Sequence, residues 1–271
     1  MHNIILKLID KIVSMFNKNQ QTENDNTDPE EQNTNQDPEQ NEPEQEMNNY
    51  SKLMVHLDAG HASTTPGKGS PAATFGITYG THSVSDLTLK EYEYNRKVVA
   101  EVDRRLRSLG FNTYIVTPEV DYDVPLSTRA NRSNTMALQH PASKHIFISA
   151  HVNAVGDGKT WYVGKDRSYW CAFTTKGQTA GDKLADCFYE AADEILPKYG
   201  KKIASDTSDG DRDKEENYTV LKKTNSPAVL VESLFMTNVD DVLFLKSDEG
   251  FNAIVEIYVR AVIKYFDKYI K

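Results

Sequence analysis

The stretch of sequence that decides the fold is residues 145–154, which read HIFISAHVNA. Its first five residues form a short, mostly apolar run, which is typical of a strand buried on both faces of a sheet. The run then passes into His151 and Asn153, so the expected strand ends in polar side chains. In sheets of parallel strands, functional groups gather just beyond the carboxyl ends of the strands. Residues 145–154 therefore predict an inner strand that leads into a functional site.

Two other stretches have the same form. Residues 53–61 read LMVHLDAGH, and residues 228–238 read AVLVESLFMTN. Each starts as an apolar run, and the two continue into His61 and Glu232 respectively. The residues between the three stretches predict a further strand at 113–116 and helices at 94–109, 127–139, 178–196 and 250–268. Strands separated by helices are joined by crossover connections, which place the strands parallel. We therefore predict an α/β fold, a single domain at 51–271 with a central twisted, mostly parallel sheet flanked by helices on both faces.

The N-terminal part of the chain has a different composition. Residues 1–18 carry apolar residues at helical spacing and predict a short amphipathic helix, for which membrane-surface contact, oligomerisation or loose packing all remain open. Residues 19–48 contain ten acidic residues, no Lys or Arg, and almost no apolar side chain. Such a segment cannot bury enough surface to offset chain entropy, so we expect an acidic disordered linker.

Net charge and cysteine usage exclude some classes of function. The chain of 271 residues has a formal charge of −9, and without the ten acidic residues of 19–48 the remainder carries about +1. Nothing in this balance favours nucleic acid as a partner. The two cysteines, Cys171 and Cys187, are too few for a disulfide framework and are expected to be buried thiols.

Four side chains at predicted strand and helix ends have the chemistry of a hydrolytic metal site. His61, His151 and Glu232 follow three of the strands, and Glu91 opens the helix that follows a Gly-, Ser- and Thr-rich loop. Two imidazoles and a carboxylate can hold zinc and leave one position for water, while a second carboxylate moves the proton. Each residue alone also has an ordinary structural explanation, such as a satisfied polar side chain or a favourable charge at a helix start. The spacing matches no short zinc motif such as H-E-x-x-H.

Four blocks of residues resemble the zinc-dependent N-acetylmuramoyl-L-alanine amidases of the Amidase_3 type. Residues 57–61 resemble the motif L-D-x-G-H, and residues 65–71 resemble a T-P-G-K-x-S-P loop of phage-type members. Glu91 and Asn95 resemble an E-x-x-x-N helix. Residues 147–154 are similar to F-I-S-x-H-x-N-A, and residues 227–238 are similar to P-A-V-L-V-E-x-G-F-x-x-N. The sequence departs from these motifs at Ala62 and at Ser233-Leu234, where the family has glycine or small residues.

The resemblance implies a role for each matching residue. His61, Glu91 and His151 would bind one Zn²⁺ per chain, and Glu232 would be the general base and acid. Glu93 is the alternative to Glu91 at the same helix start, and its distance to Asn95 and Gly110 disfavours it. Two further residues, Asn153 and Arg129, are expected to contact substrate. Four aromatic residues are candidates for walls of the groove and, equally, for ordinary packing in the core: Trp161, Tyr162, Tyr169 and Trp170.

The implied function is hydrolysis of the amide bond between N-acetylmuramic acid and L-alanine in peptidoglycan, for cell-wall lysis. A different zinc peptidoglycan peptidase and a non-catalytic peptidoglycan-binding module remain as alternatives. Residues 1–18 lack the pattern of a secretory signal peptide. We therefore expect a phage-type enzyme that is made in the host cytoplasm, is released at lysis and acts on the cell wall. The sequence does not indicate an oligomeric state.

Overall fold

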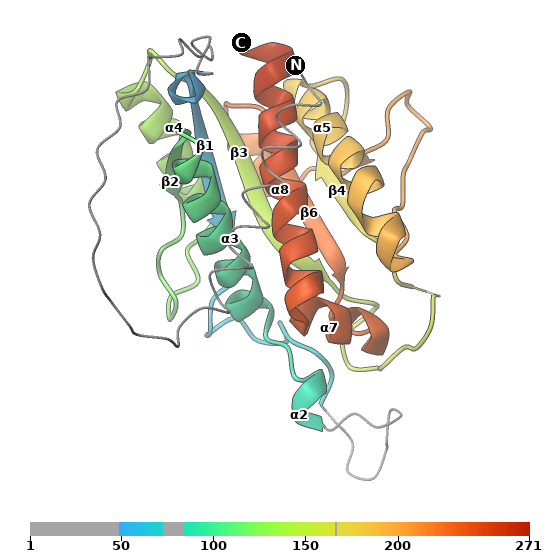
Figure 1. Ribbon diagram of the computed structural model, residues 1–271. Helices are drawn as coiled ribbons and strands as arrows, with labels where there is room; N and C mark the ends of the chain where they lie inside the picture. Colours follow the sequence, from blue (N-terminus) through green and yellow to red (C-terminus); the bar gives the residue numbers. More distant parts are fainter. Residues whose placement is uncertain (1–48, 73–83, 166) are drawn as a thin grey trace, which may run out of the picture. The chain divides into compact units, whose positions relative to one another are not determined.

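A computed structural model describes residues 49–72, 84–165 and 167–271 (Figure 1). The helix predicted at residues 1–18 and the linker predicted at 19–48 lie outside the described residues. The unit that begins at Met47 has its own contacts and contains every strand and helix described below.

The centre of the fold is a six-stranded sheet with the strand order β2-β1-β3-β6-β4-β5. Its strands are β1 (Leu53–Ala59), β2 (Asn112–Ile115), β3 (Lys144–Asn153), β4 (Cys171–Thr174), β5 (Lys214–Glu215) and β6 (Ala228–Phe235). Strands β1, β2, β3 and β6 are parallel to one another, whereas β4 runs antiparallel to β6 and parallel to β5. The prediction of a mostly parallel sheet is therefore confirmed.

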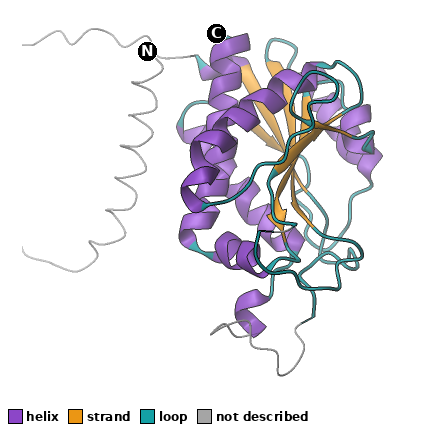
Figure 2. Ribbon diagram, turned by 90° about the vertical axis from the view of Figure 1, so that its right-hand side faces the viewer, coloured by secondary structure: helices purple, strands orange, loops and turns teal. Residues whose placement is uncertain are grey.

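Helices cover both faces of this sheet, as Figures 1 and 2 show. The helices are α2 (Val84–Leu87), α3 (Glu91–Ser108), α4 (Leu126–Gln139), α5 (Ala180–Ile195), α6 (Thr219–Lys223), α7 (Val239–Lys246) and α8 (Asp248–Tyr269), with short 3₁₀ turns η1 (Tyr50–Lys52) and η2 (Leu196–Tyr199). On one face α8 packs between α3 and α5, and on the other face α4 packs against α6. No helix among the described residues is both long enough and apolar enough to cross a membrane.

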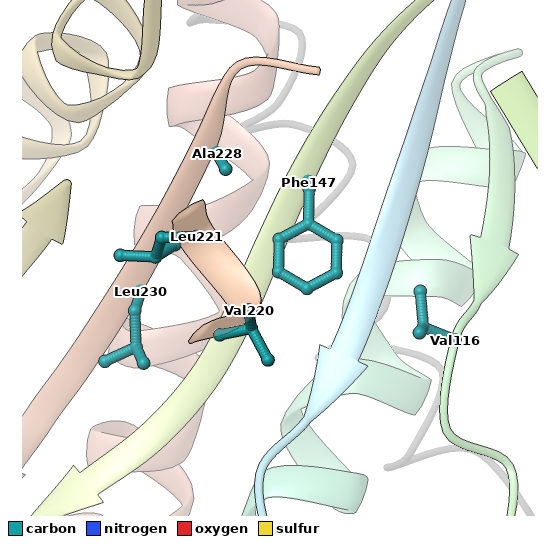
Figure 3. Packing of buried hydrophobic residues seen from close by; sticks show 6 residues of the cluster. All are labelled: Val116, Phe147, Val220, Leu221, Ala228 and Leu230. Carbon is teal, nitrogen blue, oxygen red and sulfur yellow. The ribbon is translucent and has the colours of Figure 1, made fainter. Parts of the chain in front are cut away.

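The central strands are buried on both faces because their side chains alternate between the two helical layers. In β1 the side chain of His56 contacts Ser133 of α4, with 2.7 Å between Nδ1 and Oγ, so its neighbours in the strand face the layer of α3 and α8. On the α6 side, a cluster of buried residues fills the space between helix and sheet (Figure 3): Val116, Phe147, Val220, Leu221, Ala228 and Leu230. Continuous apolar runs in the sequence predicted these strands, which have helices on both faces.

The helix boundaries follow local chemistry that the sequence already carries. Helix α3 ends just before Gly110, whose φ of 95° lies in the left-handed region that glycine tolerates best. Helix α5 starts at a capping box. The Thr179 hydroxyl accepts the N–H of Gly181, and the Asp182 carboxylate accepts the N–H of Thr179. None of the elements predicted from the sequence falls at residues 155–176, and part of that segment forms the antiparallel strand β4.

Candidate active site

The loop after β1 brings His61 to the carboxyl edge of the sheet. Its backbone adopts a φ of 64°, an unusual conformation for a residue with a side chain, of the kind that collects at functional sites. The carbonyl of His61 accepts a hydrogen bond of 2.8 Å from Arg96 Nη1 of α3, which supports this conformation. The preceding Gly60 donates its N–H to Ala150 of β3 over 3.0 Å, so the loop stays attached to the neighbouring strand.

Glu91, the first residue of α3, points into the same place. It is 1% exposed, and its Oε1 accepts the backbone N–H of Val152 at 3.1 Å. The same oxygen lies 3.0 Å from His151 Nδ1, while Oε2 lies 3.5 Å from His61 Nε2. Glu93 instead is exposed on the helix surface and contacts Lys90 and Tyr92. Of the two candidates at this helix start, the structure therefore brings Glu91 to the histidines.

His61, Glu91 and His151 together form a compact set of potential metal ligands. One ligand atom from each residue lies within 4.8 Å of the other two. The two imidazole rings are 4.9 Å apart and nearly perpendicular, at 86°. Glu91 Oε2 is buried without a hydrogen-bond partner among the described residues. A buried carboxylate oxygen with no donor is costly unless a cation faces it, so this donor set fits a zinc ion.

The ionisation of these residues follows from their burial and mutual contacts. Burial lowers the pKa of His61 to about 4, although the Glu91 charge opposes this change. Burial alone would raise the pKa of Glu91, but the contacts with His151 and His61 outweigh it and the net direction is downward. For His151 burial acts downward, and the Glu91 hydrogen bond and charge raise its pKa overall. A neutral His61 beside an ionised Glu91 is the combination that metal ligation requires.

Glu232 lies next to this set because of strand register. In the parallel pair β3–β6, His151 is directly opposite Glu232, so both side chains project from the same face of the sheet. The register then shifts between His151 and Asn153, and Leu234 of β6 adopts a φ of 65°. This irregularity is a β-bulge, a feature that often redirects a chain beside an active site. Leu234 stands where the family motif has glycine, the residue that best tolerates this backbone conformation.

The environment of Glu232 suits proton transfer. Its Oε2 is buried and has no hydrogen-bond partner in the described part of the chain. Burial raises the pKa of Glu232 to about 7, and the negative charge of Glu91 adds to the effect while His151 and Lys68 oppose it. A carboxyl group whose pKa lies near neutral pH can both accept and return a proton.

Cys171 occupies the position opposite Glu232 on its other side, in β4. Both cysteines are buried free thiols, as the sequence predicted. Burial raises the pKa of each thiol, so neither is a reactive thiolate at neutral pH.

A buried ion pair lies directly beneath the site. Asp58 of β1 is fully buried and pairs with Arg129 of α4, with 3.1 Å between Oδ1 and Nη1. Thr117 and Ser149 donate their hydroxyl groups to the same carboxylate at 3.1 and 2.7 Å. Asp58 and Ser149 are polar residues inside apolar strand runs, which is a signal that the sequence carries for a buried polar contact, whereas Thr117 lies beyond β2 and has no such signal.

Arg129, which the sequence predicts to contact substrate, is held inside the protein in this structure. Arg129 is 2% exposed, and each of its guanidinium nitrogens is engaged by protein. Nε donates to Val124 O at 2.9 Å, and Nη1 donates to Asp58 and to Ala59 O. Nη2 donates to Asp123 Oδ1 at 2.8 Å. The guanidinium therefore supports the β1 strand end from below and has no face directed at a substrate.

The other predicted contact residues lie in different surroundings. Asn153 ends β3 and is partly exposed, with its Oδ1 accepting the N–H of Ala154 at 2.8 Å. Trp170 is fully buried and packs on Tyr189, so it is a core residue and forms no wall of a groove. Tyr169 is partly exposed, packs on Phe235 and lies under the Lys214 ammonium group at 5.1 Å.

The fold and this site define a class of protein: an α/β protein with the residue set of a metal hydrolase at the carboxyl edge of its sheet. Residues 55–264 match the Amidase_3 family model, which is described as N-acetylmuramoyl-L-alanine amidase. Because the match spans most of the chain, the chain belongs to the Amidase_3 family.

Individual relatives agree with this assignment. The endolysin of Bacillus phage SPP1 is 30% identical over 215 residues, which cover 78% of this chain. The match covers 65% of that endolysin, so the chain spans just under two thirds of the length of this relative.

Solved structures with the same fold include two amidases. The N-acetylmuramoyl-L-alanine amidase from Clostridium difficile 630 matches with a TM-score of 0.59 and 20% identity, over 81% of this chain and 99% of that chain. The N-acetylmuramyl-L-alanine amidase from Mycobacterium smegmatis matches with a TM-score of 0.58, also at 20% identity, over 81% of this chain and 99% of that chain. At this level of identity the likeness shows the fold.

The buried pair beneath the site generates a first prediction. Arg129→Met leaves the Asp58 carboxylate buried without its cation, which destabilises the protein by about 3–5 kcal/mol. Urea denaturation measures this loss. The double variant Arg129→Met/Asp58→Asn removes the uncompensated charge and recovers part of the stability. Unchanged stability of the single variant, combined with a raised KM, would instead support the substrate contact expected from the sequence.

A second prediction concerns Gly60. A Cβ added at this position would lie 2.2 Å from His151 Cε1, so Gly60→Ala must displace the imidazole. Because a misoriented ligand weakens metal binding, we expect zinc affinity to fall by about 10- to 100-fold. Competition with a chromophoric chelator measures the affinity. Ser63→Ala, at an exposed position of the same loop, is the control and keeps the wild-type affinity. Equal affinities of the two variants would contradict the prediction.

Proposed function

We propose that this protein hydrolyses the amide bond between N-acetylmuramic acid and L-alanine in peptidoglycan, in a zinc-dependent reaction. The observation that carries the proposal is the convergence of His61, Glu91 and His151 beside Glu232, in a chain of the Amidase_3 family. The endolysin relative supports peptidoglycan as the substrate and the cell wall as the place of action.

The proposed metal ligands are His61, Glu91 and His151. When bound, zinc supplies Lewis-acid chemistry, because it acidifies water and polarises a carbonyl oxygen. Glu91 is held for this role by the Val152 N–H and by His151, so its carboxylate cannot rotate away without losing both contacts. Arg96 holds the His61 backbone by a hydrogen bond to its carbonyl. Gly60 has no side chain and so leaves room for the His151 ring.

Glu232 is the proposed general base and general acid. Its carboxylate takes a proton from the attacking water and passes it to the amine that leaves with L-alanine. The pKa of about 7, raised by burial, suits both steps at neutral pH. A positioned proton-transfer group of this kind contributes about 10²- to 10⁴-fold to the rate.

Substrate contacts are proposed for groups at the rim of this site. Asn153 ends the strand that carries His151 and is partly exposed, which supports assigning its amide to hold the peptide or the sugar. Lys68 lies in the loop after β1, where its charge acts on both His61 and Glu232. A cation at this position favours substrates with negative charge.

The wider setting is proposed from the sequence and from the relative. We assign catalysis to residues 51–271 and retain membrane-surface contact as the proposed role of residues 1–18, with residues 19–48 as a tether. A role in host-cell lysis follows from the likeness to a phage endolysin. Removal of residues 1–48 tests the tether, because unchanged wall or membrane association would contradict it.

Metal removal provides the main test and a prediction. We expect about one zinc per chain, loss of stem-peptide release from purified peptidoglycan after chelation, and recovery on adding zinc. Mass spectrometry of the products distinguishes the bond that is cut. Intact stem peptides with a free L-alanine amine support the amidase, whereas shortened stems would identify a peptidase. Wall binding with no released product under any metal condition would identify a binding module.

A further prediction concerns Glu232. Glu232→Gln removes the proton carrier at nearly constant size, so we expect the hydrolysis rate to fall about 10²- to 10⁴-fold while zinc content stays at the wild-type level. Glu216→Gln, at an exposed position, is the matched control and keeps the wild-type rate. A Glu232→Gln protein that digests peptidoglycan at the wild-type rate would show that Glu232 has no catalytic role.

A further inference from the structure

A second group of carboxylates lies at the other end of β4, away from the residues described above. Asp182 belongs to the first turn of α5, and Asp211 and Asp213 belong to the segment that leads into β5. One oxygen from each of the three lies within 4.8 Å of the other two. Two segments, the start of α5 and the segment before β5, thus place acidic groups together.

The carboxylates are more than an exposed acidic patch, because two of their oxygens are buried without a donor. Asp213 is 1% exposed, and its Oδ2 accepts a hydrogen bond from the Thr174 hydroxyl of β4. Its Oδ1 has no hydrogen-bond partner among the described residues. Asp211 Oδ1 is also buried and also lacks a hydrogen-bond partner there. A buried carboxylate oxygen with no donor costs free energy unless a cation or a proton faces it.

The neighbouring cations of the described chain are engaged elsewhere. Arg212 donates to Asp193 and stacks on Tyr189, and Lys268 donates to Glu190. None of the ion pairs described joins a Lys or Arg to Asp182, Asp211 or Asp213. Burial raises the pKa of Asp213 to about 7, with the facing Asp211 carboxyl adding to the effect, and burial also raises the pKa of nearby Asp186. The cluster therefore concentrates negative charge that the protein itself does not neutralise.

We propose that Asp182, Asp211 and Asp213 bind a hard divalent cation, of which Ca²⁺ fits best. Carboxylate oxygens are the ligands that hard cations prefer, whereas the nitrogen-containing set around His61 suits zinc. Ca²⁺ accepts irregular coordination by six to eight oxygens, so three carboxylates can be supplemented by backbone carbonyls and water. Mg²⁺ demands a near-ideal octahedron at shorter distances, which residues from two separate segments meet less readily.

The bound cation has a structural role. It ties the segment before β5 to the start of α5, and Asp213 in turn is bonded to Thr174 at the end of β4. The next residue, Lys214, starts β5 opposite Phe173, and its ammonium group lies over the Tyr169 ring. The other end of β4 carries Cys171 beside Glu232, so the cation stabilises the strand that borders the candidate active site.

The test measures thermal stability of the full chain, loaded with zinc, at pH 8, which is above the pKa of about 7 of Asp213. After treatment with a calcium chelator, millimolar Ca²⁺ is expected to raise the wild-type Tm by about 2–8 °C. Asp213→Asn and the more exposed Asp211→Asn reduce this shift to a small fraction. Asp209→Asn, at an exposed position of the same segment, is the matched control and retains it. All these proteins keep the acidic residues 19–48, so differences between them report on the cluster alone.

Terbium luminescence provides a second measurement on the unaltered protein. Tyr189 packs against Arg212, which lies between the two aspartates in sequence, so Tb³⁺ in the cluster should be sensitised by this ring and displaced by Ca²⁺. Absence of both a Ca²⁺-dependent Tm shift and displaceable Tb³⁺ emission in the wild type would overturn the proposal in favour of a proton shared by Asp211 and Asp213. A Tm shift that Asp211→Asn and Asp213→Asn retain in full would also overturn it. Neither readout depends on peptidoglycan hydrolysis, so the result is independent of the proposed function.

Discussion

The pairing of β3 with β6 is the constraint on which the site depends. It places His151 opposite Glu232, so a proposed metal ligand and the proposed proton carrier leave the same face of the sheet side by side. The pairing of β3 with β1 then carries the loop of His61 to the same edge, and Glu91 at the start of α3 closes the set. Because the sheet is parallel here, β1, β3 and β6 end at one edge, where α3 begins. Loss of this register by one residue would turn the side chains to the opposite face.

A second buried layer gives this edge its rigidity. Asp58 and Arg129 form an ion pair that is almost wholly removed from water, with hydroxyl groups of Thr117 and Ser149 completing the carboxylate's hydrogen bonds. A buried pair contributes little net stability compared with an apolar equivalent, but removing one partner is strongly destabilising. The pair therefore ties α4 to the end of β1, which leads into Gly60 and His61.

The antiparallel end of the sheet connects the two carboxylate sites. Strand β4 has only four residues, yet one end lies beside Glu232 and the other end bonds Asp213. The nitrogen-containing donor set at one end and the oxygen-only set at the other differ in the cations that they suit. Hydrolysis is therefore assigned to Glu232 and the donor set around His61, whereas stabilisation of β4 is assigned to the three aspartates.

The sequence by itself determined the class of fold and most of the candidate site. Apolar runs ending in polar residues located β1, β3 and β6 and made His61, His151 and Glu232 candidates, and the helix start after the Gly-rich loop made Glu91 a candidate, because these signals are local in the chain. The tertiary structure decided what depends on pairing between distant segments. It paired Arg129 with the buried Asp58, made β4 antiparallel in a segment with no predicted element, and gathered Asp182, Asp211 and Asp213. The register of paired strands, the burial of a side chain and the approach of Asp211 to Asp213 arise only when strands and helices pack. No local sequence pattern specifies them.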